Sequence, residues 1–310
     1  MTTTPQPPQV LAPAGDGTGR GDVAATLRAT KRRLASPWAT VAAIVLAALW
    51  TVPTLGLLVT SFRPVEDINS SGWWTVVGNP NFTLENYQTV LAVDSSQSLL
   101  PFVVNSVVIT IPSVLLPVFL ATLAAYAFAW MRFPGRDALF VGVFALQVVP
   151  IQVTLIPLLT LYADIGIAGT FWAVWISHTM FGLPLAVFLL HNFMREIPGE
   201  LIEAARVDGA AHVTVFFRLM LPLLKPALAA FGIYQFLWVW NDLLVALTFA
   251  GSSNQVAPMT VALFNLTGTR GSQWFLLSAG AFVSILVPAI VFLALQRYFV
   301  RGLLAGSVKG

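Results

Sequence analysis

Residues 195–226 read REIPGELIEAARVDGAAHVTVFFRLMLPLLKP and separate two long apolar runs. This segment, called the 195–226 loop below, holds four of the sixteen basic and four of the thirteen acidic residues. Pro198 suits a first helical position, and Gly209 suits a helix end about three turns later. At about 1.5 Å per residue that helix is about 16 Å long, too short to cross a bilayer.

A second short helix is expected over residues 210–221, ended by Pro222. In the first helix, Ala204 and Ala205 are small enough for another protein's backbone to approach closely. Glu203 and Asp208 flank them with charge. Composition alone fits a partner-binding element and also fits a simple solvated loop.

The composition indicates a membrane protein. Of the 310 residues, 57% are hydrophobic and only 9% are charged. A soluble domain of this size could not bury so much apolar surface, so an all-α polytopic membrane protein is expected. The chain has no cysteine, which excludes disulfides, thiolate metal sites and cysteine catalysis. Its basic residues are dispersed rather than gathered on one patch, so nucleic-acid binding is not indicated.

Six apolar runs are long enough to cross a hydrocarbon core of about 30 Å. They cover residues 37–61, 101–130, 138–162, 170–193, 223–249 and 274–299. Fourteen of the sixteen Lys and Arg residues fall on one side of the resulting topology; Arg63 and Arg270 fall on the other. The positive-inside rule therefore places both termini and the 195–226 loop in the cytoplasm.

The first 35 residues differ from the rest of the chain. They are rich in Pro, Gly, Ala and Thr, show no periodicity, and carry five basic residues. We expect residues 1–35 to form a disordered cytoplasmic tail and residues 36–310 to form the transmembrane domain.

Several polar side chains interrupt the apolar runs. Polar groups at membrane depth are costly, which makes them candidates for a substrate pathway. Aromatic rings beside amide and carboxylate groups suit a sugar, because rings pack on its CH face while polar groups bind its hydroxyls. The alternative is hydrogen bonding between helices, at about 0.6 kcal/mol per pair. The candidates are Gln147, Gln152, Trp240, Asn241 and Asp242; His178 is read mainly as an interhelical hydrogen-bonding residue.

One short pattern in the 195–226 loop resembles a known family. Glu203-Ala204-Ala205 is followed after three residues by Gly209 and after nine more by residues 219–222, LMLP. This spacing resembles the EAA loop of ABC importer permeases, with Leu219 where the usual pattern has Ile. In that family the loop is a coupling helix that sits in a cleft of a cytoplasmic ATPase.

Longer phrases resemble the maltose-type sugar permeases from Trp38 to Gly310. The ending resembles that of the second permease of such systems, and two phrases resemble the α-glucoside branch. The shared phrases are residues 60–64 (TSFRP), 125–129 (AYAFA), 132–136 (RFPGR), 240–242 (WND) and 296–302 (QRYFVRG); those of the α-glucoside branch are residues 72–74 (GWW) and 236–244 (FLWVWNDLL).

The resemblance implies the type I ABC importer permease fold with six transmembrane helices, in a bacterial cytoplasmic membrane. It implies a permease subunit that passes an oligosaccharide or α-glucoside from an extracellular solute-binding protein to the cytoplasm. The implied partners are a second permease and two ATPase subunits, which bind ATP and Mg, so this chain binds no cofactor. The ATPase-coupling residues would be Glu203, Ala204, Ala205, Asp208, Gly209, Leu221 and Pro222.

Catalysis by the chain itself is not indicated. It has no GxxxxGK[ST] phosphate loop, no GxSxG elbow and no HExxH motif, and its three histidines show no metal-ligand spacing. An ion-coupled secondary transporter or channel for small polar solutes is the alternative. Such proteins usually carry intramembrane charges or an inverted repeat, and neither is evident here.

Overall fold

The computed structural model describes residues 37–268 and 272–305, and every regular element in these ranges is helical. The chain divides into two compact units, residues 1–57 and 58–310. The first unit contains most of helix α2 (Pro37–Ser61), whose last residues belong to the second. The predicted tail, residues 1–35, lies outside the described residues.

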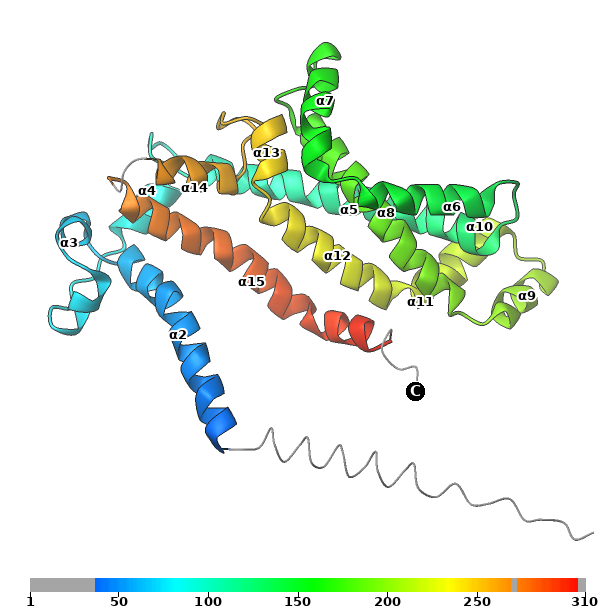
Figure 1. Ribbon diagram of the computed structural model, residues 1–310, viewed down its shortest axis with the longest axis horizontal. Helices are drawn as coiled ribbons and strands as arrows, with labels where there is room; N and C mark the ends of the chain where they lie inside the picture. The colour runs from blue at the N-terminus through cyan, green and yellow to red at the C-terminus, as the bar shows by residue number, and fades with distance from the viewer. Residues whose placement is uncertain (1–36, 269–271, 306–310) are drawn as a thin grey trace, which may run out of the picture. The chain divides into compact units, whose positions relative to one another are not determined.

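The second unit contains the remaining helices (Figure 1). Several short helices lie between successive long ones. In chain order they are α3 (Val65–Ser70), η1 (Trp73–Val77), α4 (Glu85–Leu91), α5 (Leu100–Trp130), α6 (Arg136–Ala145), η2 (Leu146–Val148), α7 (Ile151–Asp164), α8 (Phe171–Arg195), α9 (Gly199–Val207), α10 (His212–Thr214), η3 (Val215–Met220), α11 (Leu221–Leu223), α12 (Lys225–Trp240), α13 (Leu244–Phe249), α14 (Met259–Thr267) and α15 (Trp274–Ala305).

Four described helices are long and apolar enough to cross a membrane: α2, α5, α8 and the Trp274–Gln296 part of α15. Two bent helix pairs raise the number to six if each pair counts as one span. This confirms the predicted all-α polytopic fold. The ends of the first, second and fourth predicted runs agree with α2, α5 and α8 within two residues. The side of the membrane on which the termini lie stays a prediction.

The third predicted run is wrong as one continuous helix. Its two parts, Arg136–Val148 and Ile151–Asp164, meet at 98°, and α7 turns away from the line of α6 (Figure 1). The bend falls at Pro150, which has no N–H to donate and which restricts the residue before it to an extended conformation. Val149 accordingly has ψ 119° and Pro150 has ψ 129°.

The fifth predicted run is also interrupted. Helix α12 ends at Trp240, and α13 starts at Leu244. Asn241 and Asp242 lie in the break, and their side chains bind nearby backbone groups. Nδ2 of Asn241 donates to the carbonyl of Leu237 at 2.7 Å, while the carboxylate of Asp242 accepts from the start of α13. Such local side-chain bonds compete with the helical pattern.

Pro222 does not end the second helix of the 195–226 loop, which corrects the prediction. In a regular α-helix its ring would clash with the carbonyl of Arg218. The preceding residues, Val215–Met220, instead form a wider π-helix, in which the N–H of Leu221 bonds to the carbonyl of Phe216. Helical structure therefore continues to Leu223 and then bends by 70° into α12.

The most extensive helix pairing in the second unit is between α5 and α8. Small residues allow this close approach, since Ala121, Ala125 and Ala186 are all fully buried. The same core continues into the 195–226 loop through Ile202, Val215 and other buried residues. The loop is therefore part of the packed body of the protein.

Candidate functional site

Helix α9 has one buried face and one exposed face. Ile202 is 5% exposed and packs in the core with residues of α5 and α8, and Ala205 packs partly against the same core. Glu203, Ala204 and Asp208 are exposed. The alternation follows from the period of 3.6 residues per turn, which places residues three apart on nearly the same side. The charged and small residues that were predicted to meet a partner thus lie on an accessible surface.

Gly209 ends α9 as predicted, through a Schellman motif. Its φ is 81°, in the left-handed region that favours glycine. The N–H of Gly209 bonds to the carbonyl of Arg206 at 3.0 Å, and the N–H of Ala210 bonds to that of Ala205 at 2.9 Å. At the other end Pro198 is the residue just before the helix, one position earlier than expected.

The remaining two predicted coupling residues lie beyond the π-helix. Pro222 is exposed and Leu221 is half-buried. Both stand at the start of α11, immediately before the 70° bend into α12. All seven predicted coupling residues therefore belong to one segment, residues 203–222, which continues through α11 into α12.

Tyr126 of α5 contacts the 195–226 loop, so the loop is connected to α5 as well as to α12. The hydroxyl of Tyr126 lies 3.0 Å from Nδ1 of His212, and its ring meets the ring of Phe216 edge-on at 5.2 Å between centroids. The guanidinium of Arg206 contacts the other ring nitrogen of His212. Sequence reasoning gave no role to these residues. The sequence signal that could have found this contact is the hydroxyl of Tyr126, which lies near the end of an apolar run.

Apolar side chains on the loop surface were also missed. Val207 is 87% exposed, Val213 is 67% exposed and Phe217 is 54% exposed. All three belong to the 195–226 loop, which also carries the charged residues of α9. Exposed apolar groups with charged neighbours are typical of a protein–protein contact surface.

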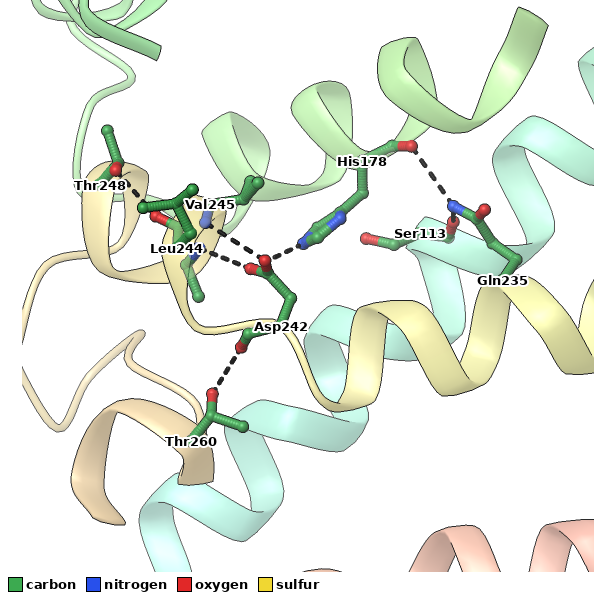
Figure 2. A network of polar contacts seen from close by, with 9 residues as sticks. Ser113, His178, Gln235, Asp242, Leu244, Val245, Thr248 and Thr260 are labelled. Atoms are coloured by element: carbon green, nitrogen blue, oxygen red, sulfur yellow. Dashed lines mark hydrogen bonds and ion pairs between the residues drawn. The ribbon is translucent and has the colours of Figure 1, made fainter. Parts of the chain in front are cut away.

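The second candidate site lies at the break of the fifth run (Figure 2). The carboxylate of Asp242 accepts hydrogen bonds from the N–H groups of Val245 at 3.3 Å and Ala246 at 2.8 Å. Its backbone carbonyl accepts from the hydroxyl of Thr260 in α14 at 2.6 Å. Asp242 thus caps α13 and connects it to α14.

Two buried side chains extend this site towards α5 and α8. Nε2 of His178, which is fully buried, lies 3.6 Å from Oδ2 of Asp242. The amide of Gln235 donates to the carbonyls of Ser113 at 3.2 Å and His178 at 3.3 Å (Figure 2). Gln235 was missed, although an amide within an apolar run is the signal that singled out Gln147 and Gln152.

Several polar atoms of this cluster have no hydrogen-bond partner among the described residues. They are the hydroxyl of Ser113, both ring nitrogens of His178 and the side-chain carbonyl oxygen of Gln235. The polar contact of the His178 side chain with another element is the one with Asp242 at 3.6 Å, and its backbone carbonyl accepts from Gln235. A buried polar cluster of this kind offers water a set of hydrogen-bonding groups.

The other predicted pathway residues are more dispersed. Trp240 is 3% exposed and donates from its indole N–H to the carbonyl of Ser284 in α15 at 3.0 Å. Asn241 is exposed beside it. Gln147 and Gln152 are exposed on either side of the 98° bend. No hydrogen bond among the described residues joins them to the Asp242 cluster.

Taken together, the structure defines a helical membrane protein with interrupted spans and an amphipathic helix outside the membrane-length segments. Residues 117–304 match the family model described as "Binding-protein-dependent transport system inner membrane component". The match covers more than half of the chain, and the chain belongs to this family.

Two curated relatives are similar over most of the chain. The "Osmoprotective compounds uptake permease protein GgtD" of Synechocystis sp. is 53% identical over 273 residues, which are 87% of this chain and 91% of the relative. The "Alpha-glucoside transport system permease protein AglG" of Rhizobium meliloti is 50% identical over 81% of this chain and 68% of the relative. These relatives confirm the predicted kinship with ABC importer permeases.

A solved structure shares the fold. A chain of a bacterial ABC transporter involved in the import of the acidic polysaccharide alginate has a TM-score of 0.64 and 21% identity. The match covers 84% of this chain and 96% of that chain. The protein is therefore a membrane-embedded permease component of a binding-protein-dependent transport system. Family membership also sets aside the alternative of an ion-coupled carrier or channel.

Proposed function

We propose that this chain is one of two permease subunits of an ATP-driven importer that passes an oligosaccharide or α-glucoside from an extracellular binding protein to the cytoplasm. The sugar class rests on the similarity to the α-glucoside permease of Rhizobium meliloti. Uptake of labelled disaccharides, with the purified binding protein supplied, tests it. Transport of no α-glucoside or other oligosaccharide by the assembled system would contradict the substrate class.

The observation that carries the coupling role is the exposed face of α9 on a loop that packs against α5 and α8. Glu203, Ala204, Ala205, Asp208, Gly209, Leu221 and Pro222 would engage the ATPase. Closure of the ATPases on nucleotide would then move α9, and two connections would carry this movement. One is the bend from α11 into α12, and the other is the contact of His212 with Tyr126 in α5.

The partners follow from this role. Two ATPase subunits would bind ATP and Mg, and a second permease would complete the pathway. This chain would bind no cofactor and catalyse no reaction. The basic residues on one side of its topology support insertion in a bacterial cytoplasmic membrane with both termini in the cytoplasm.

Gln147, Gln152, Trp240, Asn241 and Asp242 are proposed to contribute to the sugar pathway. Gln147 and Gln152 flank one break in a span, and Asn241 and Asp242 lie in another. Irregular backbone at membrane depth is tolerated where it lines a cavity or is buried in protein. Asn241→Leu should reduce sugar uptake while ATPase binding stays normal. Unchanged uptake would assign Asn241 a structural role.

The coupling role is tested with variants of α9. Glu203→Lys reverses an exposed charge, and Gly209→Asp places a side chain in the left-handed turn. Both should abolish transport and weaken capture of the ATPase, while the protein still inserts. Asp94→Lys is the matched control, because it reverses an exposed charge far from α9 in the chain. Normal ATPase capture and uptake by both α9 variants would contradict the proposal.

A further inference from the structure

A cationic cavity lies between the end of α5 and helix α9. Its volume is about 720 Å³, and its wall includes Ala129, Trp130 and Met131 on one side and Gly199 and Ile202 on the other. The charged or titratable side chains in its wall are Arg132, Arg136, Arg195, Arg206, Glu203 and His212. Four arginines thus share a cavity with one carboxylate.

Most of this positive charge is unbalanced. Arg136 forms an ion pair with Asp137 at 2.8 Å. Within the described residues, the guanidinium groups of Arg132, Arg195 and Arg206 have no carboxylate within ion-pair distance. Like charges that share a cavity repel one another, so an anion bound among them lowers the electrostatic energy. Guanidinium groups are suited to phosphate because they donate two parallel hydrogen bonds.

The cavity adjoins the end of a membrane-length helix. Its wall includes Trp130 in the last turn of α5. Tryptophan is enriched at the level of lipid headgroups, where its ring contacts both apolar and polar surroundings. Basic pockets beside the cytoplasmic ends of membrane helices suit anionic lipid headgroups.

A neighbouring cavity offers space for an apolar part of the same ligand. It has a volume of about 320 Å³ and shares Arg136 and Arg195 with the larger cavity. Phe128, Phe140 and Val141 form most of its apolar wall. A phosphate group beside the arginines would therefore have an apolar surface within reach of an attached glycerol and acyl chain.

We propose that this pair of cavities binds an anionic phospholipid, with the headgroup phosphate among Arg132, Arg195 and Arg206. The phosphate chemistry alone would also accept a soluble phosphate. The position at the end of a membrane span and the apolar second cavity favour the lipid. This site is separate from the transported sugar, and its occupation does not depend on the proposed substrate.

Native mass spectrometry of the purified full chain tests the proposal. The delipidated protein is titrated with phosphatidylglycerol and, separately, with phosphatidylcholine of the same acyl chains. Phosphatidylglycerol should bind with at least ten-fold higher affinity. Arg132→Gln and Arg195→Gln should each weaken it about five-fold, as expected for one basic residue near an anionic headgroup. Arg218→Gln is the matched control, because it removes an exposed charge of the same loop outside the cavity.

Three results would overturn the site. The first is equal binding of the two lipids, and the second is equal weakening by Arg218→Gln. The third is competition by inorganic phosphate at micromolar concentration, which would assign the cavity to a soluble anion. Circular dichroism of each variant distinguishes loss of the site from loss of the fold.

Discussion

The hydroxyl of Tyr126 in α5 lies 3.0 Å from Nδ1 of His212, which is 86 residues further along the chain. The tyrosine belongs to a membrane span, and the histidine belongs to the loop that carries the EAA-like pattern. Under the proposed coupling, a movement of α9 would reach α5 through the contacts of Arg206 with His212 and of His212 with Tyr126, in addition to α12 through the backbone. Both routes run beside the packed core that Ile202 and Phe216 share with α5 and α8.

Replacing Tyr126 tests the side-chain route. Tyr126→Phe keeps the ring contact with Phe216 and removes only the hydroxyl. We expect a loss of about 1 kcal/mol in stability, the usual net value of one hydrogen bond, and less sugar transported per ATP hydrolysed. Tyr162→Phe is the control, since it removes a hydroxyl bonded to Ser177 at 3.0 Å between α7 and α8. A similar loss of coupling in both variants would show that the effect is not specific to the loop.

Replacing Gly209 tests the Schellman motif. Gly209→Ala should destabilise the loop by about 1–2 kcal/mol, because alanine is strained at φ 81°. Gly209→Asn should lose less, since asparagine tolerates this conformation. Gly199→Ala has open space and no positive φ, and serves as the control. Thermal unfolding of the three purified variants gives the order; equal midpoints for Gly209→Ala and Gly199→Ala would rule out a strained turn.

A close approach of α8 to α12 makes Gly182 sensitive to substitution. A Cβ atom there would lie 2.7 Å from the side-chain amide of Gln235, which two hydrogen bonds hold in place. Gly182→Ala should therefore cost about 1–3 kcal/mol. Adding Gln235→Ala should recover part of the loss, because it removes the obstructing amide. Additive losses in the double variant would indicate that the two residues are not in contact.

Asp242 is expected to stabilise α13 chiefly by capping. Asp242→Ala removes both acceptors of the Val245 and Ala246 N–H groups and should cost about 1–2 kcal/mol. Asp242→Asn keeps one acceptor oxygen and should cost less than half as much. Denaturation in detergent compares the two. If the two variants lose the same stability, the charge beside His178 matters more than the cap.

The absence of cysteine allows a clean test of orientation. Val207→Cys and Val93→Cys each create a single thiol at an exposed position, since these valines are 87% and 80% exposed. A membrane-impermeant maleimide should label Val93→Cys in intact cells. It should label Val207→Cys only after the membrane is opened. The reverse pattern would invert the predicted topology.

Span positions and the end of α9 could be predicted from the sequence because they depend on local properties. Apolar length locates α2, α5 and α8, since any span must cover the same hydrocarbon thickness. The stop at Gly209 is likewise local, because only the backbone conformation of one residue decides it. The family could also be predicted from the sequence, because its motif is defined by the spacing of Glu203, Gly209 and Pro222 along the chain.

The positions at which the third and fifth spans break could not be predicted from local sequence in the same way. Pro150 breaks its run, whereas Pro112, Pro117, Pro157, Pro184 and Pro288 lie inside helices. Pro222 is accommodated by the preceding π-helix, Val215–Met220, which the local sequence did not predict. Whether a proline interrupts a helix depends on what else can bind the freed carbonyls and fill the space.

The sequence by itself determined that this chain is a helical membrane protein with a short amphipathic helix between two spans. Hydropathy, the distribution of basic residues and motif spacing are properties of the sequence, and they do not depend on how the helices pack. Only the tertiary structure decided which polar groups meet. Asp242 lies beside His178, 64 positions away in the sequence. Gln235 bonds to the carbonyls of His178 and Ser113, 57 and 122 positions away, and so connects α8 and α5. Tyr126 contacts His212, 86 positions away. Packing brings these residues together.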